Sequence, residues 1–178
     1  MRYAALLRGI NVGGNRKVAM ADLRELLAGL GYDAVTTYLQ SGNAVISTAR
    51  SSPAALAAEV EERVAERFGA PVRVIIRTGA QLAGVVGASP LPDGPQNPSR
   101  FFVAFLSAAP DPRAVQDIEA QAFGPDRIWV SGAEAYLWCP GGAADTPLTH
   151  SFIEKRLGVT ATARNWNTVT KLVSLTSG

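Results

Sequence analysis

Apolar residues along the first half of the chain alternate between strand-like and helix-like spacing. Residues 1–7 form a short apolar run typical of a buried strand, and residues 20–30 carry leucines at helical spacing up to Gly31. Ser41-Gly42-Asn43 separates two further strand-like runs, because Gly and Asn tolerate the positive φ of a hairpin turn. The full order is strand 1–7, helix 20–30, strands 33–39 and 44–47, a helix from Ser52-Pro53 to Gly69, and strand 72–76. This order predicts a split βαβ, or ferredoxin-like, unit.

The second half of the chain repeats this order of elements without repeating the residues. A capping-box pattern, Thr78 to Gln81, opens a short helix over residues 78–86, and four prolines then interrupt residues 87–99. The repeat comprises strand 100–106, a helix from Asp111-Pro112 to Gly124, strands 127–130 and 134–138, a helix from Thr146-Pro147 to Gly158, strand 159–163 and helix 165–175.

The predicted fold class is α+β, with two tandem ferredoxin-like units (βαββαβ, α/β plait) and an extra C-terminal helix. The expected domains are residues 1–78 and 100–178, joined by the short helix and proline-rich connection over residues 79–99.

The composition is that of a globular protein. Hydrophobic residues make up 47% and charged residues 18% of a chain of 178 residues, which is long enough to bury a core. One Cys and one His exclude a disulfide framework and a Cys/His zinc cage, and we expect no metal and no cofactor. A net charge of +2 is far below that of a protein that coats nucleic acid. Arg8 interrupts the apolar stretch at the N-terminus, and no segment reaches the roughly 20 apolar residues that span a bilayer. We therefore expect a cytoplasmic protein without membrane contact.

The loop after the first predicted strand, residues 8–17, is rich in groups that bind anions. Its glycines let backbone N–H groups converge, its asparagines add amide donors, and its basic side chains add charge. In a ferredoxin-like unit this loop opens at the same end of the sheet as the 40–43 hairpin. The predicted ligand-binding residues are Arg8, Asn11, Gly13, Gly14 and Lys17, with Gln40, Ser41 and Asn43 as a wall, and Asn15 and Arg16 belong to the same loop. The alternative is a plain turn in which Gly and Asn only permit unusual φ values. The loop is neither a Walker A loop nor a Gly-x-Gly-x-x-Gly motif.

Residues 164–168 form a second concentration of hydrogen-bond donors. Asn165 is expected to cap the last helix, and Arg164 beside it suits bidentate binding of an anion. Asn167 and Thr168 complete the candidate set, which would reach the loop of the first unit. The alternative is structural: Trp166 belongs to the core, and its polar neighbours are ordinary first-turn residues.

Three stretches of the sequence resemble the signatures of domain-of-unknown-function family 1697, a family of small bacterial proteins. They are Leu6-Leu7-Arg8-Gly9-Ile10-Asn11-Val12-Gly13-Gly14, Gln40-Ser41-Gly42-Asn43 and Arg164-Asn165-Trp166-Asn167-Thr168-Val169. The resemblance spans nearly the whole chain and implies a tandem ferredoxin-like fold, but no activity. The chain departs from the family pattern at Thr146-Pro147, where a Ser-Lys pair is typical, so one cation is missing if that lysine belongs to the family's site.

Side chains suited to acid–base or nucleophilic chemistry are scarce in these stretches, which contain no carboxylate. We interpret His150 as a structural or surface residue, and Cys139 as inert because no cation neighbours it in the sequence. Ser41 lacks a Gly-x-Ser-x-Gly elbow. The resulting hypothesis is a protein that binds a small anionic, phosphate-bearing ligand. One alternative is a phosphoryl or nucleotidyl transfer enzyme whose metal arrives with its substrate.

RNA binding and a purely structural or interaction role are further alternatives. The predicted strand over residues 44–47 carries no aromatic side chain, so the first sheet lacks a stacking platform for bases. The second sheet is rich in aromatic residues, which we expect in a core or in an interface between the two units. They are Phe101, Phe102, Phe105, Trp129, Tyr136 and Trp138.

Overall fold

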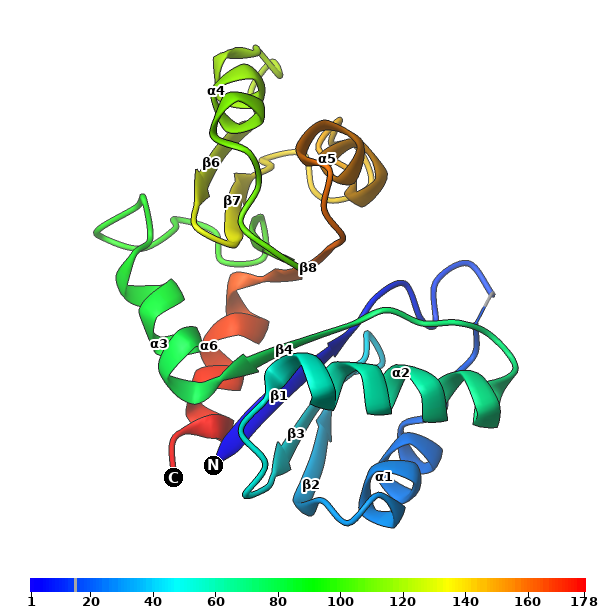
Figure 1. Cartoon of the computed structure of the whole chain (residues 1–178). Coiled ribbons are helices and arrows are strands. Elements are labelled where there is room, and N and C mark those ends of the chain that lie inside the picture. The colour runs from blue at the N-terminus through cyan, green and yellow to red at the C-terminus, as the bar shows by residue number, and fades with distance from the viewer. Residues whose placement is uncertain (15) are drawn as a thin grey trace. The chain divides into compact units, whose positions relative to one another are not determined.

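The computed structural model describes residues 1–14 and 16–178, and within them it contains two four-stranded antiparallel sheets with helices against them (Figure 1). In chain order the described elements are β1 (Arg2–Leu7), α1 (Met20–Gly29), β2 (Asp33–Tyr38), β3 (Asn43–Ser47), α2 (Pro53–Phe68), β4 (Val74–Thr78), α3 (Gly79–Gly87), β5 (Phe101–Leu106), α4 (Pro112–Ala120), β6 (Arg127–Ser131), β7 (Glu134–Trp138), α5 (His150–Leu157), β8 (Ala161–Asn165) and α6 (Trp166–Thr176). The predicted α+β class with two tandem units is confirmed. Among the described residues, no helix combines the length and the apolar character needed to cross a membrane.

The first sheet has the strand order β2-β3-β1-β4, and each neighbouring pair is antiparallel. Tyr3, Ala5 and Leu7 of the central strand β1 are fully buried in a core that α1 and α2 complete. Both helices lie on one side of this sheet (Figure 1). Side chains alternate between the two faces of a strand, so Ala4 and Leu6 face the opposite side, where they are also fully buried.

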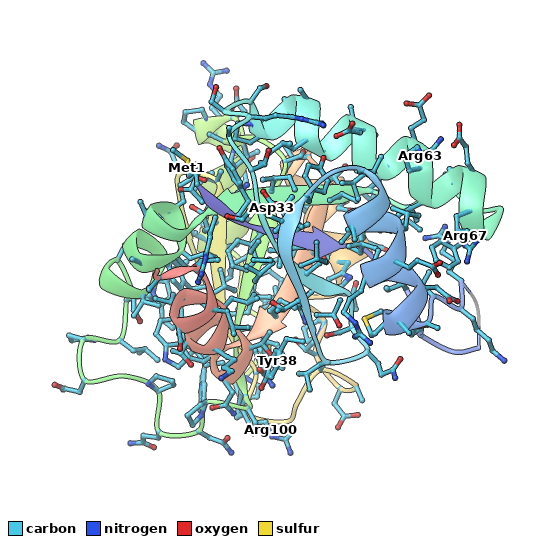
Figure 2. All side chains as sticks on the ribbon, turned by 90° about the horizontal axis from the view of Figure 1, so that it is seen from below. Met1, Asp33, Tyr38, Arg63, Arg67 and Arg100 are labelled. Atoms are coloured by element: carbon cyan, nitrogen blue, oxygen red, sulfur yellow. The ribbon has the colours of Figure 1, made fainter. Side chains whose placement is uncertain are left out.

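Local signals fix both ends of α2. Ser52 is the N-cap and its side chain accepts from Ala55 N (3.3 Å), while Gly69 ends the helix with φ 70°. Arg63 and Arg67 of α2 are both exposed (Figure 2), and they form ion pairs with Glu66 of the same helix and with Glu25 of α1. Ion pairs between side chains as exposed as these contribute little stability, so α2 is held mainly by its buried apolar stripe.

The second sheet repeats the first, with the strand order β6-β7-β5-β8 and antiparallel pairing throughout. Ala104 and Leu106 of the central strand β5 share a core with Ile118 of α4 and Ile153 of α5. On the other face, the Phe101 ring lies 5.2 Å from that of Trp166, centroid to centroid. The expectation that Trp166 belongs to a core is confirmed, since it is 9% exposed.

Both sheets end in the same arrangement, a buried arginine followed by a helix cap. Arg77 of β4 and Arg164 of β8 are 8% and 6% exposed. The residue after each of them, Thr78 or Asn165, accepts a hydrogen bond from the first turn of the next helix. Thr78 also donates its backbone N–H to Gln81 (2.8 Å), which confirms the predicted capping box. The internal repeat therefore includes a helix after the fourth strand of each unit.

The chain divides into two compact units whose limits differ from the expected domains. Unit 1 comprises Met1–Ala83 and Leu172–Gly178, and unit 2 comprises Gly84–Lys171. The end of α6 contacts unit 1, where Arg2 Nη1 donates to Leu175 O (3.3 Å). The spacing of apolar residues along the last helix does not predict this contact.

The start of α5 was predicted wrongly. Thr146-Pro147 was expected to open this helix, but Thr149 is the N-cap and accepts from Phe152 N (3.2 Å). The Thr146 hydroxyl instead donates to the buried Asp126 carboxylate and accepts from Leu148 N (3.1 Å). These bonds turn the chain before the helix begins.

Several other boundaries differ from prediction, among them those of α4 and β8. α4 ends at Ala120 rather than near Gly124, because Phe123 forms a β-bridge with Asp126. β8 extends to Asn165 because β5 continues to pair with it. In both places the hydrogen-bonding partner, and not the local sequence, sets the boundary.

Candidate functional site

The loop between β1 and α1 is held in shape by the side chain of Asn11. Its Nδ2 donates to Val18 O (2.8 Å) and to Gln40 O (2.7 Å), and its Oδ1 accepts from Val18 N (2.8 Å). The backbone of Asn11 has φ 56°, a left-handed conformation that Asn adopts more readily than most residues. The bond to Gln40 places the loop against the turn before β3, as predicted. The amide donors of Asn11 are used inside the protein, so this residue positions the loop and does not offer them to a ligand.

The middle of the loop is exposed and carries positive charge. Three residues of the predicted ligand-binding set are exposed here, Gly13, Gly14 and Lys17. Arg16, in the same loop, is exposed as well. Gly13, Gly14 and Arg16 have φ values of 59°, 78° and 49°. A Cβ atom at Gly9 would lie 3.6 Å from Arg16 Nη1, so this guanidinium lies close to the backbone of Gly9. Asn15 lies outside the described residues.

Arg8 lies where β1 leaves the sheet, beside the start of β4. Its backbone N–H donates to Arg73 O (2.9 Å), and its side chain is half-buried. The guanidinium of Arg73 lies 3.2 Å from Glu61 Oε2, so its charge is compensated by this carboxylate. The basic residues of the loop itself are Arg8, Arg16 and Lys17.

α1 begins directly after the loop with a residue that cannot cap it. Its N-cap is Ala19, which has no side-chain oxygen to accept from the N–H groups of the first turn. These groups carry the positive end of the helix dipole. No Asp or Glu precedes Asp22, which lies in that first turn. The helix start thus adds to the positive potential, and Asp22 opposes it.

The predicted wall divides into exposed and buried residues. Gln40 and Ser41 are exposed, whereas Asn43 is fully buried. Asn43 Nδ2 donates to Tyr38 O (2.8 Å) and Ser41 Oγ (3.0 Å), which shapes the turn between β2 and β3. Asn43 therefore has a structural role, and Gln40 and Ser41 are the wall residues that a ligand can reach.

The C-terminal candidates belong to unit 2. Arg164 Nη1 donates to Thr162 Oγ1 and Ala163 O, both at 2.8 Å, and burial lowers the pKa of its guanidinium to about 10. Asn165 Oδ1 accepts from Thr168 N (3.0 Å), so Asn165 caps α6 as predicted. Thr168 is buried and Asn167 is exposed. Through these hydrogen bonds Arg164 stabilises β8 and Asn165 stabilises the start of α6.

Comparison with known proteins identifies the family of this chain. The family model described as a protein of unknown function, DUF1697, matches residues 1–136. The chain belongs to this family. The matched range contains the loop between β1 and α1 and the turn before β3.

A solved structure supports the fold of this DUF1697 protein. The conserved bacterial protein SP0830 from Streptococcus pneumoniae is similar to it with a TM-score of 0.75 and 24% sequence identity, over 99% of this chain and 98% of that one. Identity at this level shows the fold alone. None of the curated proteins matches the chain.

His150 and Cys139 of the DUF1697 protein carry groups that could take part in acid–base or nucleophilic chemistry. His150 Nε2 accepts from Ala163 N (3.2 Å), which links α5 to β8. Cys139 is 1% exposed, and burial raises the pKa of its thiol, so the thiol stays protonated at neutral pH. Among the described residues no three His, Cys, Asp or Glu side chains gather in a way that could hold a metal ion.

A pocket of about 370 Å³ in unit 2 was not predicted from the sequence. It is lined by Trp129 and Trp138, which are half-buried rather than core residues, and by the segment 91–96. The Pro-Asp-Gly turn at 92–94 and the two tryptophans are visible in the sequence. The sequence does not show that the turn and the tryptophans lie close together.

Proposed function

We propose that unit 1 binds a small phosphate-bearing anion at the loop between β1 and α1. The contacting groups are the side chains of Arg8, Arg16 and Lys17 and the backbone N–H groups around Gly13 and Gly14. Gln40 and Ser41 form the rim. The observation that carries this proposal is the set of three hydrogen bonds made by the Asn11 side chain, the Asn11 bracket. They tie the two ends of an exposed, positively charged segment together at Asn11 and Val18, and they hold Asn11 against Gln40.

The chemistry of the loop favours phosphate over a neutral ligand. Successive backbone N–H groups in a turn can converge on a concave site for an anion. Guanidinium groups bind phosphate oxygens through two parallel hydrogen bonds, and the lysine adds a point charge. A helix start without a side-chain cap adds further donors. Because the side chains proposed to contact the anion include no carboxylate and no imidazole, recognition suits the loop better than proton transfer.

We also infer that both units have the ferredoxin-like topology, as the family resemblance implies. The support is the order strand–helix–strand–strand–helix–strand in each unit, together with an antiparallel sheet in which the fourth strand pairs with the first. This topology explains why a loop near residue 13 and a turn near residue 41 share one end of a sheet.

A thermal-shift screen tests the binding proposal with inorganic phosphate, nucleotides and sugar phosphates as probes. A ligand at one hundred times its Kd adds about 2.7 kcal/mol to stability, which for this chain length is on the order of 5–11 °C. The double variant R16A/K17A should lose the shift. The control R113A/K155A removes one exposed Arg and one exposed Lys from unit 2, and it should keep the shift.

An equal loss of shift in both double variants would refute the proposal, because it would mean that net charge alone binds the probe. The nucleotide probes are also assayed for product. Turnover that R16A/K17A abolishes would identify a transferase instead of a binding protein.

Asp22→Asn provides a gain-of-affinity test of the same site. Removing a negative charge from the first turn of α1 should tighten phosphate binding roughly two- to five-fold. Asp117→Asn, an exposed site on α4, is the matched control and should not change the affinity. Unchanged phosphate affinity in Asp22→Asn would contradict a role for the helix start.

A further inference from the structure

Trp129 and Trp138 differ from the buried aromatic residues of the second sheet by their exposure. Both are half-buried, whereas Phe101 and Tyr136 are at most 1% exposed. Trp129 of β6 lies opposite Tyr136 of β7, and Trp138 lies two residues further along β7. Because alternate residues of a strand share a face and paired residues face the same way, both indoles stand on one face of the sheet.

A tight turn in the connection after α3 faces these indoles. Gly94 N donates to Leu91 O (2.9 Å), which closes a β-turn with Pro92 and Asp93 at its central positions. Ser89 Oγ accepts from Leu91 N (3.2 Å) and holds the start of the turn. Pro92 has a fixed φ, so the turn presents the Asp93 carboxylate from a constrained backbone. Figure 1 shows this connection passing beside β6 and β7.

The turn, Gln96 and the two indoles line the pocket of about 370 Å³ described above, which is open to solvent on one side. Its volume lies within the range of small-molecule sites, roughly 300–1,000 Å³. Two tryptophans, Leu91 and Pro92 give it apolar walls, and Asp93 is the charged group among the described residues that line it. All of these residues belong to unit 2.

We propose that this pocket is a second ligand site, which binds a small organic cation of the alkylammonium class. The positive group would lie against the indole faces, and Asp93 would supply the opposite charge. An indole is the aromatic side chain that attracts a cation most strongly, because its face carries the negative part of the ring quadrupole. A phosphate-bearing ligand is disfavoured here, since it would bring negative charge to Asp93. The site is independent of the anion site in unit 1.

Titration with choline tests this proposal, with indole fluorescence and calorimetry as readouts and sodium chloride at equal ionic strength as the blank. The comparison ligand is 3,3-dimethyl-1-butanol, the neutral carbon isostere of choline. Choline should bind saturably and at least about 10-fold more tightly than the isostere, because only the charged ligand gains from the indoles and the carboxylate. Equal affinity for the two ligands, or no saturable choline response, would overturn the proposal.

Variants assign the response to the pocket. Asp93→Asn should weaken choline binding at least roughly three-fold and leave isostere binding unchanged, whereas the control Asp117→Asn should affect neither. Trp129→Leu should abolish the choline response, and R16A/K17A should preserve it. If Trp129→Leu fails to fold, the Asp93→Asn result decides alone: unchanged choline affinity in that variant refutes the site.

Discussion

The Asn11 side chain stabilises the loop between β1 and α1, and the substitution Asn11→Ala measures its contribution to the free energy of unfolding. The substitution removes three hydrogen bonds of 2.7–2.8 Å, each with a net value of about 1 kcal/mol. It also places Ala at φ 56°, a left-handed conformation that costs an ordinary L-residue roughly 1–2 kcal/mol. The hydrogen bond to Gln40 O is exposed, so in the variant water can bond to this carbonyl and offset part of the lost free energy. We expect unit 1 to lose about 3 kcal/mol of unfolding free energy, or roughly 6–12 °C in Tm.

Two further substitutions at Asn11 separate the contributions. Asn11→Gly loses the same hydrogen bonds without the backbone strain, so it should be less destabilised than Asn11→Ala. Asn11→Asp keeps the acceptor for Val18 N, but it loses both donors and turns a carboxylate toward two carbonyl oxygens. It should therefore be at least as destabilised as Asn11→Gly.

Urea denaturation gives the free energies from the shift in midpoint at constant slope. A loss of less than about 0.5 kcal/mol in Asn11→Ala, the range of ordinary surface substitutions, would refute the bracket. The same experiment bears on binding, because a loosened loop must be ordered by the ligand. The thermal shift given by phosphate-bearing probes should therefore shrink in Asn11→Gly.

Two other predictions concern unit 1. Gly42→Ala should destabilise it by about 2–5 kcal/mol, because the residue has φ 84° and its Cβ would lie 2.8 Å from Ile10 Cδ1; a urea midpoint equal to that of wild type would contradict this. Glu59 accepts hydrogen bonds from Tyr32 and Arg50, which hold the pKa of its carboxyl below the usual 4.5. Because its folded pKa is below its unfolded pKa, Glu59 stabilises the protein above about pH 4.5 and loses this contribution as the pH falls through the lowered value. The urea midpoints of wild type and Glu59→Gln should thus differ at pH 7 and converge as the pH falls well below 4.5, and a constant difference would show that the charge of Glu59 is not involved.

Helix ends that depend on residues close together in the chain could be predicted from the sequence. The Thr78–Gln81 capping box appears where it was predicted, and Ser52 caps α2 at the predicted start of that helix. In each case the donor and the acceptor lie within three residues, so residue type and spacing decide the bond. Hydrophobic periodicity likewise identified the strands and helices of both units, because each element buries one face.

The chemistry of the candidate residues depended on distant partners. Asn11 looked like an anion donor, but its amide is taken by Gln40, a residue 29 positions away. Thr146 looked like a helix start, but its hydroxyl binds Asp126. Donors and acceptors pair with whatever the fold places within reach, and the sequence lists the groups without their distances.

The sequence by itself determined the alternation of strands and helices, the tandem repeat and the positive charge of the loop after the first strand. Only the tertiary structure decided which polar groups are used internally and which face solvent, because burial and hydrogen-bond competition are properties of the packed chain. Trp129, Trp138 and Asp93 show the difference most clearly. Asp93 lies 36 positions before Trp129 in the chain, and the pairing of β6 with β7, together with the turn closed by Gly94, brings all three residues around one pocket.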